Sequence, residues 1–169
     1  MSFQKQVLVL KDVFESPTQN KKSLVGIARI EIDNGVAELF LSLVNVPLLV
    51  NAKYYLWVID HDQTIHSFEL GTSPISTVKV FENMPSIEKG VSVGIYAVKD
   101  QLPLTIAFSK SENGTFTLSQ FKKTVAEKQL EQITKKMSPE TVQNMLDRSI
   151  KKSVILLERY AIQETPTDQ

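Results

Sequence analysis

The sequence contains no cysteine, so the chain can form neither a disulfide framework nor a cysteine zinc site, and it has no thiol nucleophile. Its 19 basic and 19 acidic side chains leave no net charge, and therefore no whole-molecule field that attracts nucleic acid. With only six glycines, it has neither a glycine-rich phosphate loop nor a G-x-S-x-G nucleophile elbow. We expect no nucleic-acid partner, no cofactor and no enzymatic activity.

Long apolar runs are also missing. No uncharged apolar stretch approaches the roughly 18 residues that a membrane-spanning helix needs. The first residues alternate apolar and polar side chains, and they place Lys11 and Asp12 where a signal peptide needs an unbroken apolar core. We therefore expect no membrane span, no signal peptide and a cytoplasmic location.

Residues 3–110 have mostly a two-residue apolar period, which is typical of β-strands. Asn34-Gly35 lies between two such stretches, and this dipeptide favours a tight hairpin turn. Proline and glycine separate most of the remaining stretches. The sequence predicts strands at about 3–13, 24–33, 36–44, 53–60, 65–70, 75–81, 91–98 and 102–109.

Eight short strands without helices between them favour an antiparallel β-sandwich, predicted for residues 1–114. The same pattern also describes a closed β-barrel that binds a small apolar ligand, and this alternative stays open. Residues 54–59 are apolar on both faces, as expected for a central strand that is covered on both sides. The C-terminal region is the candidate for the outer cover.

After Asn113-Gly114 the apolar period becomes helical. Thr117 and Gln120 have the spacing of a capping box at the start of a first helix. Ser138-Pro139-Glu140 then has the pattern of a second helix start, and that helix is expected to reach about residue 162. The sequence thus predicts a helical hairpin at 115–163, followed by a disordered tail at 164–169.

Both predicted helices carry an apolar stripe that must be buried. The stripes can pack on a partner protein, on a second copy of the chain, or on the outer face of the sandwich itself. We favour a non-enzymatic protein-binding or assembly module that binds a protein partner or forms a homo-oligomer. The partner-binding candidates are Leu130, Ile133, Leu146, Ile150 and Leu157.

Both histidines of the chain lie in one segment, with an aspartate on each side of the first. Imidazole nitrogens and carboxylate oxygens are ligands for zinc and similar ions, so a metal-dependent enzyme is a further alternative. The spacing matches no established ligand pattern, and aspartate is common in loops. We favour a plain hairpin turn and no metal; the candidate ligands would be Asp60, His61, Asp62 and His66.

The run VAELFLSLVNVPLLVNAKYYLWVIDHDQTIHSFELG, residues 36–71, resembles the extracytoplasmic domain of anti-sigma-K-type factors. Tyr54, Leu56, Trp57 and Gly71 stand at the corresponding places of that family's Tyr-x-Leu-Trp strand and return strand. The resemblance covers about residues 24–110. It implies an immunoglobulin-like sandwich with Trp57 in its core and a non-catalytic turn at 60–64.

Two departures limit what this resemblance implies. The chain has neither a transmembrane helix nor an N-terminal sigma-binding segment with histidine and cysteine zinc ligands, so inhibition of a sigma factor does not follow. The expected fold class is mainly β with C-terminal helices (α+β): an antiparallel immunoglobulin-like sandwich followed by a two-helix hairpin.

Overall fold

The computed structural model describes residues 3–14, 22–72 and 76–135. All eight predicted strands are present, and their ends lie within one residue of the predicted positions. The fold is therefore mainly β, as predicted. The elements are β1 (Phe3–Asp12), β2 (Val25–Asp33), β3 (Val36–Val44), β4 (Ala52–Asp60), β5 (Ile65–Gly71), β6 (Ser76–Glu82), the 3-10 helix η1 (Ile87–Lys89), β7 (Val91–Lys99), β8 (Leu102–Lys110) and α1 (Leu118–Lys135).

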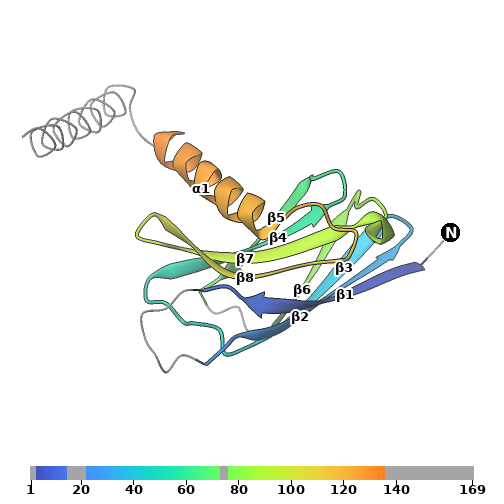
Figure 1. The fold of residues 1–169 in the computed structure, drawn as a ribbon, viewed down its shortest axis with the longest axis horizontal. Coiled ribbons are helices and arrows are strands. Elements are labelled where there is room, and N and C mark those ends of the chain that lie inside the picture. The colour runs from blue at the N-terminus through green and yellow to red at the C-terminus, as the bar shows by residue number, and fades with distance from the viewer. Residues whose placement is uncertain (1–2, 15–21, 73–75, 136–169) are drawn as a thin grey trace, which may run out of the picture. The chain divides into compact units, whose positions relative to one another are not determined.

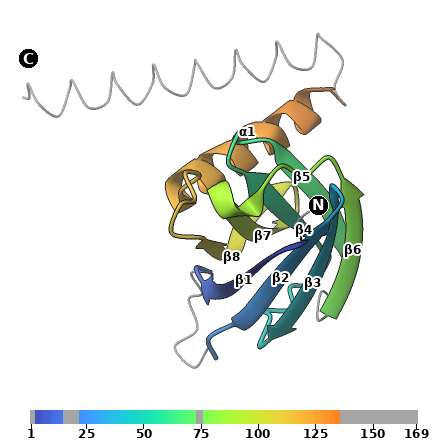
Figure 2. The same ribbon diagram turned by 90° about the vertical axis from the view of Figure 1, so that its right-hand side faces the viewer.

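The strands form one antiparallel sheet in the order β5-β4-β7-β8-β1-β2-β3-β6 (Figure 1). Its two edge strands, β5 and β6, meet through aromatic side chains. The ring of Phe81 on β6 lies with its centroid 5.1 Å from that of His66 and 5.2 Å from that of Phe68, both on β5. The sheet thus curls into a nearly closed barrel (Figure 2).

The predicted immunoglobulin-like sandwich is wrong. A sandwich has two separate sheets, whereas β1 pairs with both β2 and β8 and so joins all eight strands into one. An alternating pattern cannot separate the two folds, because strands of both have one inner and one outer face. The resemblance to anti-sigma-K-type factors is contradicted with it.

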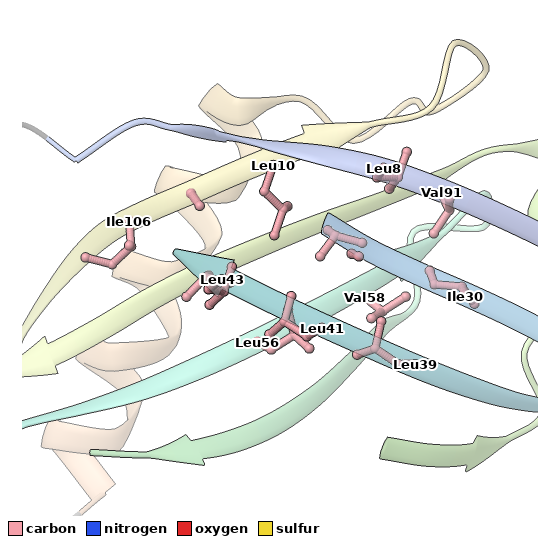
Figure 3. Packing of buried hydrophobic residues seen from close by; sticks show 14 of the residues in the cluster. Leu8, Leu10, Ile30, Leu39, Leu41, Leu43, Leu56, Val58, Val91 and Ile106 are labelled. Carbon is pink, nitrogen blue, oxygen red and sulfur yellow. The ribbon is translucent and has the colours of Figure 1, made fainter. Parts of the chain in front are cut away.

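The inner faces of the strands fill the barrel with apolar side chains. The Asn34-Gly35 turn has positive φ at both residues, 55° and 78°, as the hairpin prediction requires, and it sets β2 and β3 in register. Inward-facing side chains from opposite walls then meet in the middle (Figure 3). This core includes Leu8, Leu10, Ile30, Leu39, Leu41, Leu43, Leu56, Val58, Val91 and Ile106.

Helix α1 begins with the predicted capping box. The backbone N–H of Thr117 donates to Gln120 Oε1 at 2.8 Å, and the N–H of Gln120 donates to Thr117 Oγ1 at 3.2 Å. Phe121 and Val125 are buried in a second apolar cluster outside the barrel. Trp57 of β4 belongs to this cluster, so it lies under the helix and not in the barrel core.

The predicted two-helix hairpin is not supported. Among the described residues α1 is the single α-helix, and its first turns bury their apolar side chains on the sheet. The predicted second helix, 139–162, and the tail, 164–169, lie outside the described residues. The chain divides into two compact units, Met1–Gln129 and Leu130–Gln169. No described helix has the length and apolar character that crossing a membrane requires.

Candidate binding groove

Asp60 organises the turn between β4 and β5. The residue is only 3 % exposed, and Oδ1 accepts hydrogen bonds from the backbone N–H groups of Asp62, at 2.9 Å, and Thr64, at 3.0 Å. Asp60 Oδ2 lies 3.2 Å from Nε2 of His66. Gln63, in the middle of the turn, has a φ of 64°. The carboxylate therefore replaces missing backbone partners in a tight loop.

The two histidines face different carboxylates. His66 contacts Asp60, whereas Nε2 of His61 lies 3.2 Å from Asp62 Oδ1. His61 Nδ1 is buried and has no hydrogen-bond partner among the described residues. In the described part of the chain, no three histidine, cysteine, aspartate or glutamate side chains gather in a way that could hold a metal ion. The segment forms the turn between the paired strands β4 and β5.

The predicted partner-binding residues of α1 are not buried. Leu130 is 62 % exposed and Ile133 is half-buried. The other three, Leu146, Ile150 and Leu157, lie outside the described residues. Their role in binding a partner stays a prediction.

Two tyrosines share the aromatic cluster beside α1. The rings of Tyr55 and Tyr96 stack with centroids 5.2 Å apart, and Tyr96 meets Trp57 edge to face at 5.3 Å. Burial, and to a smaller extent the nearby phenol of Tyr55, raise the pKa of Tyr96 to about 12. The pKa of Tyr55 is also raised, first by burial and then by Glu69.

Tyr96 should make the protein lose stability in alkaline solution. In the unfolded chain the phenol loses its proton near pH 10, whereas the folded protein holds it up to about pH 12. The unfolded state therefore binds fewer protons between these values, and the free energy of unfolding falls as the pH rises through this window. We expect Tyr96→Phe to show a shallower fall. Urea midpoints of both proteins at several pH values above 9 test this, and parallel curves would contradict it.

The wall of the barrel is open between β1 and β8. β1 pairs with β2 from Phe3 to Lys11, but with β8 it pairs only at Lys11 and Asp12. Successive strand residues direct their N–H and C=O groups alternately to the two neighbouring strands. Among the described residues, the β8-facing edge of β1 from Phe3 to Leu10 has no strand partner. This seam leaves backbone donors and acceptors beside a gap.

The seam holds a groove of about 610 Å³. This volume is within the range of about 300–1,000 Å³ that small-molecule sites usually have. Apolar, hydroxyl and lysine side chains share its walls. It is lined by Gln6, Val7, Leu8, Val9 and Lys11 of β1, by Phe108, Ser109 and Lys110 of β8, and by Ser111 and Leu118.

Sequence reasoning missed this groove. Its two walls come from the first and last strands, and no local pattern reports how far two distant strands pair. One signal was present: Val7, Leu8, Val9 and Leu10 are apolar on both faces of β1, and Val7 and Val9 are exposed. Such a run indicates an outer face that is available for binding.

Comparison of the chain with protein-family models, with curated proteins and with solved structures finds no match. The groove therefore has to be interpreted from its own chemistry.

Proposed function

We propose that this protein is a non-catalytic binding barrel, and that its ligand lies in the β1–β8 groove. The observation that carries this proposal is the open seam, where a groove of about 610 Å³ meets an unpaired strand edge. The barrel lumen is packed with side chains, as in other eight-stranded barrels of small diameter, so the wall is the better place for a ligand.

The groove favours an elongated ligand with an apolar body. Val7 and Val9 offer exposed branched side chains along β1, and Leu118 at the start of α1 adds a further apolar contact. Apolar walls with a few polar groups are typical of small-molecule sites, because the walls supply affinity and the polar groups fix orientation.

The polar groups of the groove favour an anionic head. Lys11 and Lys110 are both exposed, one on each wall, and Ser109 also lines the groove. Hydrogen bonds from ammonium groups to a carboxylate are stronger than neutral ones. An amphiphile with one carboxylate and an alkyl chain has both the apolar body and the anionic head that the groove favours.

The groove lacks the usual catalytic groups. Among the described residues, no histidine, aspartate or glutamate lines it, and the hydroxyl of Ser111 accepts a hydrogen bond from the N–H of Val91 at 3.0 Å. A serine nucleophile needs an adjacent general base. These features support binding without chemistry.

Charge reversal at the groove tests the proposal. Dodecanoate, below its micelle concentration, is expected to shift the backbone NMR signals of Val7, Val9 and Ser109. Lys110→Glu is expected to weaken this binding about tenfold, because it replaces a favourable charge with a repulsive one. Lys53→Glu is the matched control, since Lys53 is an exposed strand lysine outside the groove, and it should bind like wild type. Equal affinity of the two variants, or signal shifts confined to other strands, would overturn the proposal.

A second candidate is an extended peptide that adds a strand to the free edge of β1. The unpaired edge from Phe3 to Leu10 favours it, because a peptide can satisfy backbone groups that an alkyl chain cannot. A short acidic peptide that shifts the β1 signals where dodecanoate fails would favour this candidate over the amphiphile.

A further inference from the structure

A second exposed feature lies on the outer side of β1, β2, β3 and β6; it adjoins the groove and shares Val7 and Val9 with it. Nine of the thirteen exposed large apolar side chains of the described residues belong to it. We call this surface the open face. Its members are Phe3, Val7, Val9, Val25, Ile27, Val36, Val44, Val78 and Val80.

Strand register shows that apolar groups adjoin at several places of this face, with polar side chains such as Arg29 and Ser42 between them. Val9 pairs with Ile27, and on the next row Phe40 pairs with Val78, so neighbouring strands present apolar groups side by side. The outer side of the opposite half of the barrel has the same apolar character at Trp57 and Tyr96, and there α1 covers it. No described helix covers the open face.

The open face is large enough for a stable interface. Four strands about 4.8 Å apart and nine residues at about 3.3 Å each give a footprint of roughly 19 Å by 30 Å. The accessible surface of a side-chain-covered face exceeds its flat footprint, and a standard interface buries about 800 Å² on each partner.

Charge is distributed unevenly along the open face. Its acidic side chains lie at the end beside the Asn34-Gly35 turn, where Lys5 pairs with Glu31, and Lys11 lies at the other end, next to Val25. Between the two ends, Arg29 lies 3.5 Å from Glu31. In a symmetric dimer, the two faces can be related by a two-fold axis that runs across the strands. The acidic end of one copy then lies over the Lys11 end of the other. The acidic side chains are Glu31, Asp33, Glu38 and Glu82.

Association through the β6 edge of the sheet is disfavoured. Lys79 of β6 pairs with Leu39, whose side chain is buried in the barrel, so Lys79 lies on the inner side of an edge strand. Inward-pointing lysines on edge strands oppose the addition of another strand. Contact through the face is therefore favoured over contact through the edge.

We propose that the open face packs against the open face of a second copy of this chain. Sheets stacked in this way lie about 10 Å apart, with interlocking side chains. The face contains a hollow of about 410 Å³ between Val7, Ile27, Arg29, Phe40 and Val78, and an apolar side chain of the other copy fills it. Arg29 lies over the ring of Phe40 at 4.2 Å and forms one wall of this hollow.

Lysines placed on the open face test the proposal. The wild-type full chain is expected to have a solution mass of about twice 19.0 kDa, and Ile27→Lys/Val78→Lys the mass of one chain. Val50→Lys/Leu102→Lys is the control, because both residues are exposed and apolar but lie off the face; this variant should stay dimeric. Sedimentation at several concentrations gives the masses, and circular dichroism establishes that each variant is folded. A monomeric wild type, or a dimer that survives in the first variant, would overturn the proposal.

A single-cysteine series gives a second test that does not depend on folding effects of lysine. Because the chain has no cysteine, Ile27→Cys introduces one defined thiol, and a short bismaleimide is expected to join two such chains covalently. Val50→Cys should remain uncrosslinked under the same conditions. Equal crosslinking of both variants would show that the copies meet elsewhere.

Discussion

Phe121→Ala is expected to lower the free energy of unfolding by about 3–5 kcal/mol. The ring is fully buried between α1 and the sheet, with centroids 5.6 Å from Trp57 and 5.5 Å from Phe108. It fills the space above Gly94, where an added Cβ would lie 2.4 Å from the ring. Removing the ring leaves a cavity over a glycine, which has no side chain that could fill it.

The matched control is Leu130→Ala in the same helix. Leu130 is 62 % exposed, so its truncation should change the free energy of unfolding by less than about 0.5 kcal/mol. Urea unfolding followed by circular dichroism measures both variants, and fluorescence of the single tryptophan, Trp57, reports the cluster itself. Similar small effects in both variants would mean that α1 contributes little to the stability of the barrel.

Asp60→Ala is expected to cost about 2–3 kcal/mol. The carboxylate accepts two backbone hydrogen bonds and contacts His66, and alanine leaves those groups without their partner in a largely buried position. The loss should also loosen the turn, so amide exchange at Asp62 and Thr64 should accelerate.

Asp62→Ala controls for charge in the same turn. The Asp62 side chain is 67 % exposed and is not an acceptor for the turn's backbone, so its removal should cost less than about 0.5 kcal/mol. Zinc is expected to leave the urea midpoints of wild type and both variants unchanged. If zinc stabilised the wild type and either substitution abolished that stabilisation, the turn would not be purely structural.

The strands and the first helix could be predicted because their signals are local. The alternation of apolar and polar residues indicated which side chains of 24–44 face inward, and Asn34-Gly35 indicated the position of the turn. Thr117 and Gln120 marked the helix start by a contact over only three residues. The burial of both faces of β4 was likewise predictable, because residues 54–59 contain no polar side chain except the phenol groups.

The barrel and its groove could not be predicted in this way. Whether eight strands make one sheet or two depends on the pairing of β1 with β8, and only Lys11 and Asp12 make it. The role of Asp60 could not be predicted either. The sequence does not distinguish an exposed loop aspartate from a buried one that accepts hydrogen bonds from the loop backbone. Both features depend on tertiary neighbours, which local patterns do not encode.

The seam also sets the order in which the protein can be completed during synthesis. β1 leaves the ribosome first, whereas its second neighbour, β8, follows about 90 residues later, which corresponds to roughly 5–20 s of translation. β1, β2 and β3 are consecutive and can pair early, but the wall closes only when the last strand arrives. A chain that stops before Leu102 has seven of the eight strands and lacks the one that joins its two halves.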